Sequence, residues 1–491
     1  MNHRLRITAA VASRLSAHHL AAGKRAEAIS LAMGHAYASA DGEVTVVLAD
    51  PGALYLFGDD CYDARGFAHA SLSRDVRAAV CWQAVQSGYS AIVDIHDHHF
   101  ADVAQFSGVD DRDDRNTARF FEQTLPRFLE PGRRMFAAAL LLARDEWAAR
   151  IVHAGDAAPA MAEMRIDIVG DPWRQPGRAA PPAEQAAFDR QRAVIPPAAQ
   201  ALLAGAHAVL IGCGGTGSIA AETLIRLGVG QITLVDNDTV ESSNLHRFQG
   251  GVPADVGRYK VSCVAQRLRA MWPSAHVDAI ASQVFDRAAI ARLEQADFIV
   301  GCLDNAETRW WLNRFAVQYM VPYFDCGVLI ETEPALVMRT RVSVVIPGAG
   351  PCGHCSPLEF FPRQRPGQFL DATTLAAERS AGYVQDTPSM QADPAIYPLN
   401  QLAVSGLARE LIAWVTGAKP VAHSLCYRDD SQVTERIELV AFGGGGADDC
   451  PLCAYLAGRC REPELPAVDD DGQISLPEFT TEEPDHGQIQ S

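Results

Sequence analysis

The stretch AVLIGCGGTGSIAAETLIRLGVGQITLVDNDTVESSNLHRF, from Ala208 to Phe248, decides the fold of the larger part of this chain. A short apolar run over 208–211 predicts a buried parallel strand that opens into a glycine-rich loop. A helical pattern follows through Leu227, and a second apolar run over 232–235 ends on Asp236. This is half of a nucleotide-binding βαβ unit, in which amides at a helix N-terminus hold phosphate and the acid holds a ribose.

The polar residues that follow this unit predict a site for a nucleoside triphosphate. A dinucleotide fold holds pyrophosphate on backbone amides, whereas breaking a phosphate bond requires neutralisation of charge on the phosphate oxygens. Cationic side chains after the second strand supply that neutralisation, and Asp304, after an apolar run over 298–300, is expected to hold Mg²⁺. The predicted nucleotide site comprises Gly212, Gly214, Gly215, Gly217, Asp236, Asp238, Asn244, Arg247, Lys260, Asp304 and Asn305.

The run from roughly Phe188 to Cys453 resembles the adenylation domain of the ThiF/MoeB and ubiquitin-activating enzyme superfamily. The resemblance implies a Rossmann-like α/β domain with a mostly parallel sheet. It also implies that ATP and Mg²⁺ are used to adenylate the C-terminal carboxylate of a small ubiquitin-like β-grasp protein. Catalytic roles then fall to Arg247, Lys260 and Asp304.

The same resemblance implies a homodimer. Arg190, in the segment Phe188-Asp189-Arg190-Gln191, is the candidate for an arginine that reaches the ATP γ-phosphate of the partner subunit. The alternative is a surface arginine on an amphipathic helix.

Two Cys-x-x-Cys pairs account for four of the twelve cysteines, and the rest are scattered as in a reducing compartment. Each pair presents two thiolates to one ion, and four thiolates complete the tetrahedron of a zinc site. A separation of about 95 residues is too long for a small finger and fits the structural zinc that the resemblance implies. Unpaired core cysteines are the alternative. The predicted ligands are Cys352, Cys355, Cys450 and Cys453.

Between the two pairs lies a polar stretch, about 357–399, which the resemblance identifies as the crossover loop. In the superfamily this loop carries a catalytic cysteine just before a proline-led helix, but no cysteine occurs here between Cys355 and Cys426. Ser389 stands at the expected place. Either the reaction stops at the acyl-adenylate, or Ser389 accepts the acyl group as an oxyester, or the serine replaces a native cysteine. An ordinary loop serine is the remaining alternative.

A second chemical motif lies near the N-terminus, where an apolar run over 91–95 leads into His96-Asp97-His98-His99. Two histidines at i and i+2 with a downstream aspartate supply three ligands of a catalytic zinc site with an open fourth position. The pattern resembles the JAB/MPN metallopeptidase motif, with His99 where proline is usual. The resemblance implies the metal ligands His96, His98 and Asp110.

In the same motif Ser107 is expected to stabilise the tetrahedral intermediate. Glu27, in a segment that keeps only the ends of the family pattern, is the candidate general base. A polar loop without a metal, or an inactive JAB fold that docks the modifier, are the alternatives.

Length predicts two or three domains, since 491 residues exceed the usual size of one. We expect a JAB/MPN-like α/β domain over 1–165 and a proline-rich linker over 166–186. The adenylation domain then covers 187–461, and an acidic disordered tail covers 462–491. Within the first domain, helices are expected over 9–32 and 119–141, and residues 112–115 are expected to form a solvated loop.

Composition excludes several classes of function. A net charge of −18 argues against nucleic-acid binding. No run approaches the eighteen apolar residues of a membrane span, and the polar N-terminus is not a signal peptide, so a cytoplasmic protein is expected.

The sequence thus predicts activation of a ubiquitin-like protein in a bacterial ubiquitination-like pathway, with processing or deconjugation by the N-terminal domain. A ubiquitin-conjugating-enzyme-like protein is a further expected partner. The alternatives are a sulfur-carrier adenylyltransferase for cofactor synthesis, a non-catalytic scaffold that binds a ubiquitin-like protein, and a dehydrogenase.

Overall fold

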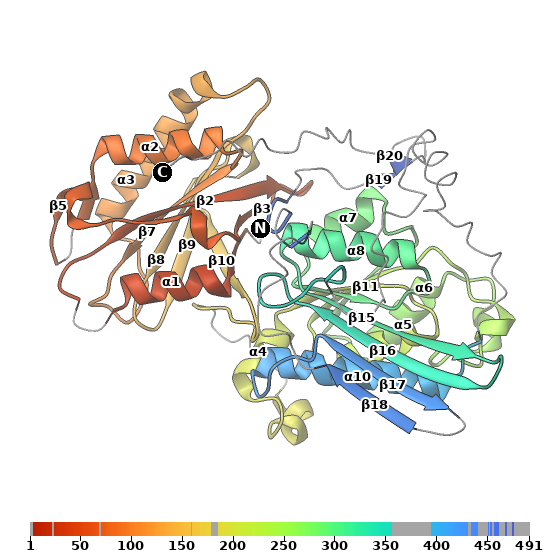
Figure 1. Ribbon diagram of the computed structural model, residues 1–491. Helices are drawn as coiled ribbons and strands as arrows, with labels where there is room; N and C mark the ends of the chain where they lie inside the picture. The colour runs from red at the N-terminus through yellow and green to blue at the C-terminus, as the bar shows by residue number, and fades with distance from the viewer. Residues whose placement is uncertain are drawn as a thin grey trace.

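Two eight-stranded sheets dominate the part of the chain that the structure describes (Figure 1). This computed structural model describes residues 3–21, 24–67, 70–158, 160–177, 185–355, 394–430, 434–439, 450, 452–453, 456–460, 467–468 and 474–475. No helix among these residues is long and apolar enough to cross a lipid bilayer.

The first sheet is mixed and strongly curved. Its strand order is β3-β1-β10-β9-β8-β7-β2-β4, and β2 also pairs with β3, so the row of pairings closes on itself. The strands are β1 (Arg4–Thr8), β2 (Ile29–Ala38), β3 (Val44–Leu48), β4 (Leu54–Leu56), β7 (Ala91–Asp97), β8 (Phe136–Leu142), β9 (Trp147–His153) and β10 (Glu163–Val169). A small hairpin of β5 (Tyr62–Arg65) and β6 (Ala70–Leu72) lies outside this sheet.

Helices cover both faces of the first sheet. α1 (Ala9–His19) packs on one face, and α2 (Arg74–Gln86) and α3 (Gly108–Gln123) pack on the other (Figure 1). Because successive side chains of a strand point to opposite faces, Val93 joins the core under α1 while Ile92 joins the core under α2 and α3. By the same alternation His96 and the next residue, Asp97, point to opposite faces.

Several expected elements of the first domain are wrong. The first helix ends at His19, and residues 29–38 form β2, because pairing with β7 and β3 overrides local helical propensity. Residues 112–115 lie inside α3 instead of in a loop. The helical pattern expected over 119–141 ends at Gln123, ahead of Pro126, and β8 follows. β10 runs to Val169, beyond the expected boundary at 165, since Ile166 and Ile168 fill the first core.

The second sheet has a parallel part and an antiparallel part. Its order is β13-β12-β11-β14-β15-β16-β17-β18, with parallel pairing from β13 to β15 and antiparallel pairing beyond. Chain order reverses beside β11, which has β12 on one side and β14 on the other. Ligands of open α/β sheets bind at such a reversal, outside the carboxyl ends of the strands. The strands are β11 (His207–Ile211), β12 (Gln231–Val235), β13 (His276–Ile280), β14 (Phe298–Gly301), β15 (Tyr323–Glu331), β16 (Val337–Val345), β17 (Ser424–Asp430) and β18 (Thr434–Leu439).

Two layers of helices enclose the second sheet. α4 (Pro197–Ala204), α5 (Gly215–Leu227), α6 (Lys260–Met271) and α10 (Tyr397–Thr416) contribute to one core. α7 (Arg287–Glu294) and α8 (Ala306–Tyr319) contribute to the other, and Figure 1 shows this pair on the opposite side of the sheet from α10. The sheet is therefore buried on both faces, as its nearly continuous apolar strands require.

The two domains share a buried polar seam. Arg4 of β1 donates to Asp297, just before β14, with 2.7 Å between Nη1 and Oδ1. Arg6 donates to the carbonyl oxygens of Tyr319 and Ala296, and the Trp414 indole donates to the carbonyl oxygen of Gly170 at 2.8 Å. These contacts attach the first sheet to the base of the strand whose other end leads to Asp304.

Candidate functional site

A pocket of about 1500 Å³ opens at the carboxyl ends of β11, β12 and β14, where the topology predicts one. It collects residues from the glycine loop, the turn after β12, the start of α6 and the turn after β14. Of the residues predicted to bind nucleotide, it is lined by Gly212, Gly214, Gly215, Asp236, Asp238, Asn244, Arg247, Lys260, Asp304 and Asn305.

Two glycines at this loop, Gly212 and Gly217, leave no room for a side chain. Gly212 has φ +88°, in the left-handed region, and a Cβ there would lie 2.5 Å from the carbonyl oxygen of Cys302. Gly217 is not among the residues that line the pocket. A Cβ on Gly217 would lie 1.8 Å from the carbonyl oxygen of Gly212, so this glycine lets α5 pack against the loop. The first amides of α5 are thereby presented to the pocket, where the helix terminus favours an anion.

Asp236 joins the ends of the first two strands of the nucleotide fold. One carboxylate oxygen accepts from the Cys213 amide at 2.6 Å and the other accepts from the Asp238 amide at 2.7 Å. Burial raises the pKa of Asp236 above its usual value, although both amide hydrogen bonds oppose the shift. Each carboxylate oxygen keeps a lone pair, so the group can also accept from a ribose hydroxyl.

The cations approach the glycine loop from two sides. Lys260, the first residue of α6, donates to Asp238 with 2.7 Å between Nζ and Oδ2. The Arg247 side chain lies against Gly215, because a Cβ on that glycine would be 3.0 Å from Arg247 Cδ. A triphosphate bound in this pocket would be close to the positive charges of Arg247 and Lys260 and to the N-terminus of α5.

Two residues of the predicted nucleotide site, Asp304 and Asn305, follow β14. Asp304 is exposed and lines the pocket, while the Asn305 side chain accepts from the Thr308 amide at 2.8 Å and caps α8. The exposed carboxylate has oxygen chemistry that suits Mg²⁺, which prefers one or two carboxylates together with substrate phosphates.

Sequence reasoning missed several lining residues. Asn400, in the first turn of α10, is 1% exposed, and its Oδ1 accepts from the Thr216 hydroxyl at 3.4 Å. Arg309 of α8 is 4% exposed, and its Nε donates to Asp325 at 3.1 Å. A buried arginine needs an acidic partner. Asp325 lies 16 residues away on another element, so the sequence does not show that it is the partner of Arg309.

Arg190 lies away from this pocket in its own chain. It is exposed on a 3₁₀ helix over Gln185–Gln191, where the Gln191 amide side chain donates to the Leu227 carbonyl at the end of α5. The phosphate loop is at the other end of α5, about 20 Å away for a 13-residue helix.

Most of the crossover loop, with Ser389, lies outside the described residues, as does most of the tail expected over 462–491. The hypotheses about both remain predictions.

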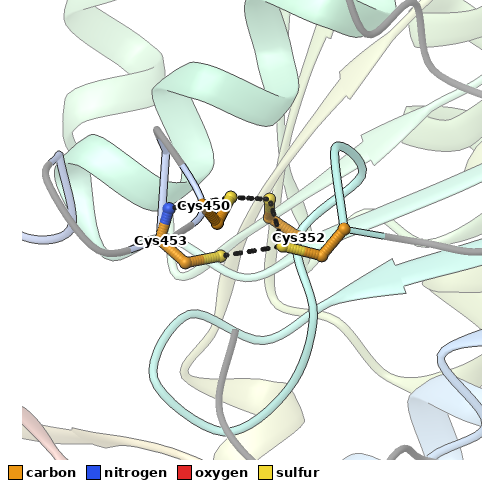
Figure 2. A group of neighbouring side chains, drawn as sticks. Cys352, Cys450 and Cys453 are labelled. Carbon is orange, nitrogen blue, oxygen red and sulfur yellow. Dashed lines mark hydrogen bonds between the residues drawn. The ribbon is translucent and has the colours of Figure 1, made fainter. Parts of the chain in front are cut away.

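The four predicted cysteine ligands come together (Figure 2). Sγ–Sγ distances are 3.8 Å for Cys352–Cys355, Cys352–Cys450 and Cys355–Cys453. Zinc–sulfur bonds of about 2.3 Å in a tetrahedron give sulfur–sulfur edges of about 3.8 Å. The donor set and its spacing therefore fit one Zn²⁺. The cluster packs in the core under α8, where the Gly353 amide donates to Asn313 at 2.7 Å.

A second group of metal-ligating side chains lies in the first domain. His96 Nε2 is 3.2 Å from one oxygen of Asp110, and His98 Nε2 is 3.8 Å from the other. Ligands at about 2.0–2.2 Å from one Zn²⁺ would be separated by similar distances. Two imidazoles and one carboxylate are a donor set that fits a catalytic zinc site.

The two residues expected to assist this group lie beside it. Glu27 Oε1 is 3.9 Å from His98 Nε2, and burial raises the pKa of Glu27 to about 7. Ser107 caps α3, because its hydroxyl oxygen accepts from the amides of Val109 and Asp110. The Ser107 side chain also hydrogen-bonds the Asp110 carboxylate. The cap also fixes Asp110 in the first turn of α3.

The family match to known proteins lies in the part of the chain that contains the nucleotide pocket. Residues 188–441, just over half of the chain, match the ThiF family. The chain belongs to the ThiF family. This ThiF-family chain is 33% identical over 172 residues to the Sulfur carrier protein ThiS adenylyltransferase of Bacillus subtilis, which covers 34% of this chain and 49% of that protein.

One further relative and one solved structure were also found to be similar. Ubiquitin-like modifier-activating enzyme 5 of Dictyostelium discoideum is 27% identical over 161 residues, covering 30% of this chain and 41% of that protein. A solved structure of E. coli MccB with ATP has a TM-score of 0.43 at 20% identity, over 55% of this chain and 75% of that one. The ThiF-family chain spans about half or less of the length of the Bacillus subtilis and Dictyostelium discoideum proteins.

Proposed function

We propose that the second domain uses ATP and Mg²⁺ to adenylate the C-terminal carboxylate of a small ubiquitin-like protein. The observation that carries this proposal is one pocket in which the glycine loop, Arg247, Lys260 and Asp304 converge. A non-catalytic scaffold has no need of this cluster, and a dehydrogenase needs little cationic help. The names of the relatives, an adenylyltransferase and a modifier-activating enzyme, support the same class of reaction.

In the proposed reaction a carboxylate oxygen of the partner attacks the α-phosphorus of ATP, and the bond from that phosphorus to pyrophosphate breaks. The amides at the start of α5 hold phosphate oxygens, and Arg247 and Lys260 neutralise the charge that develops on them. Mg²⁺, when bound, neutralises the leaving pyrophosphate, and Asp304 would hold it. No covalent protein group is required, because positioning and electrostatics supply the catalysis.

The later steps of the proposal rest on the sequence. The acyl-adenylate is either passed directly to another nucleophile or transferred to Ser389 as an oxyester. A serine hydroxyl is a weak nucleophile without a neighbouring base, but an acyl-adenylate is a strongly activated acyl donor with AMP as the leaving group. A ubiquitin-conjugating-enzyme-like protein would then receive the acyl group. Homodimer formation, with Arg190 reaching the partner subunit's ATP, is part of this proposal.

For the first domain we propose a JAB-like zinc hydrolase that cleaves an amide bond after the C-terminus of the same small protein. The support is the group formed by His96, His98 and Asp110, with Glu27 beside it. Zn²⁺, when bound, supplies Lewis-acid chemistry. Glu27 would take the proton of the attacking water and give it to the leaving amine, and Ser107 would donate to the tetrahedral oxyanion.

Sulfur-carrier activation is the second candidate. The specific observation that favours it is that relatives from Bacillus subtilis and Thermus thermophilus are named sulfur carrier protein adenylyltransferases. The two candidates share the adenylation step and differ in the acceptor, so the product formed after adenylation distinguishes them.

ATP–pyrophosphate exchange tests the shared step. We expect exchange with a ubiquitin-like or sulfur-carrier partner and none with the same partner lacking its last two residues. Asp304→Ala is expected to lower the exchange rate at least about 100-fold, equivalent to about 2.7 kcal/mol. Glu331→Gln, which alters an exposed pair with Arg339, is the matched control. Absence of exchange from folded protein with every partner, or exchange by Asp304→Ala equal to that of the parent, would refute the proposal.

A further inference from the structure

Asp97 lies between the two histidines of the first-domain metal group and faces away from them. Side chains alternate along a strand, so His96 points to one side of β7 and Asp97 to the other. His98, the residue directly after β7, lies with His96 and Asp110. Its side chain is completely buried. A buried carboxylate is unfavourable unless donors surround it, so its partners indicate what it does.

Four nitrogen atoms from three parts of the chain converge on this carboxylate. Oδ2 accepts from His19 Nδ1 at 2.8 Å and from Lys24 Nζ at 2.5 Å. The same oxygen accepts from the Ala28 amide at 3.0 Å, and Oδ1 lies 2.9 Å from His99 Nδ1. The carboxylate thus joins α1, the segment before β2, and the turn after β7.

Two of these contacts are one residue away from residues of the candidate metal centre. Ala28 follows Glu27, and His99 follows His98. Glu27 Oε1 and His98 Nε2 are themselves only 3.9 Å apart. One carboxylate therefore holds the backbone amide next to the candidate base and the side chain next to a candidate ligand.

The donor from α1 is also held in place. His19 is fully buried, and its Nε2 lies 2.8 Å from the Ser30 hydroxyl oxygen on β2. Burial lowers the pKa of His19 to about 4, so its ring is neutral at pH 7. A neutral ring that donates from Nδ1 to Asp97 accepts at Nε2 from the Ser30 hydroxyl.

We propose that Asp97 is a positioning residue of the first-domain metal centre, which sets the separation between the candidate base Glu27 and the metal ligands His96 and His98. The inference rests on the proposed hydrolase function. Asp97 itself does not contact the metal or the substrate. In other proteins, residues that hydrogen-bond and orient metal ligands without touching the metal contribute about 10–100-fold to metal affinity, and we expect a contribution of this size from Asp97.

Cobalt(II) binding to the metal-stripped full-length protein tests this role without measuring catalysis. Cobalt–thiolate charge-transfer absorption reports the four-cysteine site, whereas a site with two histidines and one carboxylate gives only weak d–d bands. We expect Asp97→Asn to lower the cobalt affinity of the site formed by His96, His98 and Asp110 about 10–100-fold. The cobalt affinity of the four-cysteine site should not change. Asp102→Asn, which alters an exposed pair with Arg144, is the matched control with parental affinity.

A second variant keeps the test decisive if Asp97→Asn does not fold. His99→Gln removes a single contact of the carboxylate, and it is expected to lower affinity by a smaller factor, about 3–10-fold. Parental cobalt affinity in folded Asp97→Asn, or in His99→Gln if the first variant does not fold, overturns the positioning role. A parent protein that binds cobalt only with the thiolate band refutes the hydrolase proposal itself, and the two failures are therefore distinguishable.

Discussion

The carboxylate of Asp236 accepts a hydrogen bond from the Cys213 amide at 2.6 Å, which ties the end of β12 to the first residues of the glycine loop. This contact holds the loop in the shape that presents the amides of α5 to the pocket. The residue expected to contact the ribose therefore also maintains the phosphate site.

We predict that Asp236→Ala weakens ATP binding about 10–100-fold. Hydrogen bonds to a charged group contribute about 1.5–3 kcal/mol, and each 1.4 kcal/mol changes the dissociation constant tenfold. Isothermal titration with a non-hydrolysable ATP analogue measures the effect, with Glu331→Gln as the control. Parental affinity in folded Asp236→Ala would show that the acid is not part of the nucleotide site.

Disruption of the four-cysteine cluster is expected to lower both the zinc content and the thermal stability of the protein. Cys352→Ser should lower zinc content by one equivalent per chain, because three thiolates and a hydroxyl bind zinc far less tightly than four thiolates. Metal analysis and thermal unfolding are the measurements. Cys81→Ser, outside the cluster on α2, should keep parental zinc content. Equal zinc in both variants would exclude the cluster as a metal site.

The polar seam between the domains gives a third prediction. Arg4→Gln leaves Asp297 buried with one partner fewer and is expected to lower the free energy of unfolding by about 3 kcal/mol. Arg226→Gln breaks an exposed pair on α5 and should change it by at most about 0.5 kcal/mol. Urea unfolding separates the two. Similar small effects in both variants would mean that the seam contributes little to stability.

His207 at the start of β11 gives a pH dependence. Burial lowers its pKa to about 4 from an ordinary value of 6.5, so between these values the unfolded ring binds a proton and the folded ring does not. The free energy of unfolding contributed by this group therefore falls as the pH falls from 6.5 to 4, by at most about 3 kcal/mol.

His207→Gln should reduce that loss, which urea unfolding at a series of pH values can measure. His276→Gln, at an exposed position on β13, should keep the parental slope. If His207→Gln and the parent lose stability equally between pH 6.5 and 4, the ring does not remain neutral in the folded protein.

The nucleotide half was predictable from sequence because its signals are local. The strand ending at Ile211, the glycines after it and the acid after β12 lie within one short stretch, and the topology brings them to one edge of the sheet. Asn400 was not predictable, because it reaches the glycine loop from a helix 184 residues away in sequence from its partner Thr216.

The first domain was harder to predict, although the sequence did single out the three side chains that come together there as a possible metal site. The apolar run over 91–95 forms most of β7, which contains His96 and ends at Asp97, directly before His98. The helix expected over 9–32, in contrast, overlaps the start of β2, whose pairing with β7 and β3 is a long-range property. The burial of Asp97 was equally hidden, because His19, Lys24 and Ala28 precede it by about 70 residues or more.

The most direct test of the adenylation proposal is the fate of an oxygen atom. A partner whose C-terminal carboxylate carries ¹⁸O is incubated with the enzyme, ATP, Mg²⁺ and hydroxylamine as the acyl acceptor. The mass of the released AMP is then measured by mass spectrometry. Attack of that carboxylate on the α-phosphorus predicts AMP that contains one ¹⁸O and a partner that ends in a hydroxamate. Unlabelled AMP, or ADP with phosphate in place of AMP with pyrophosphate, would contradict the proposal.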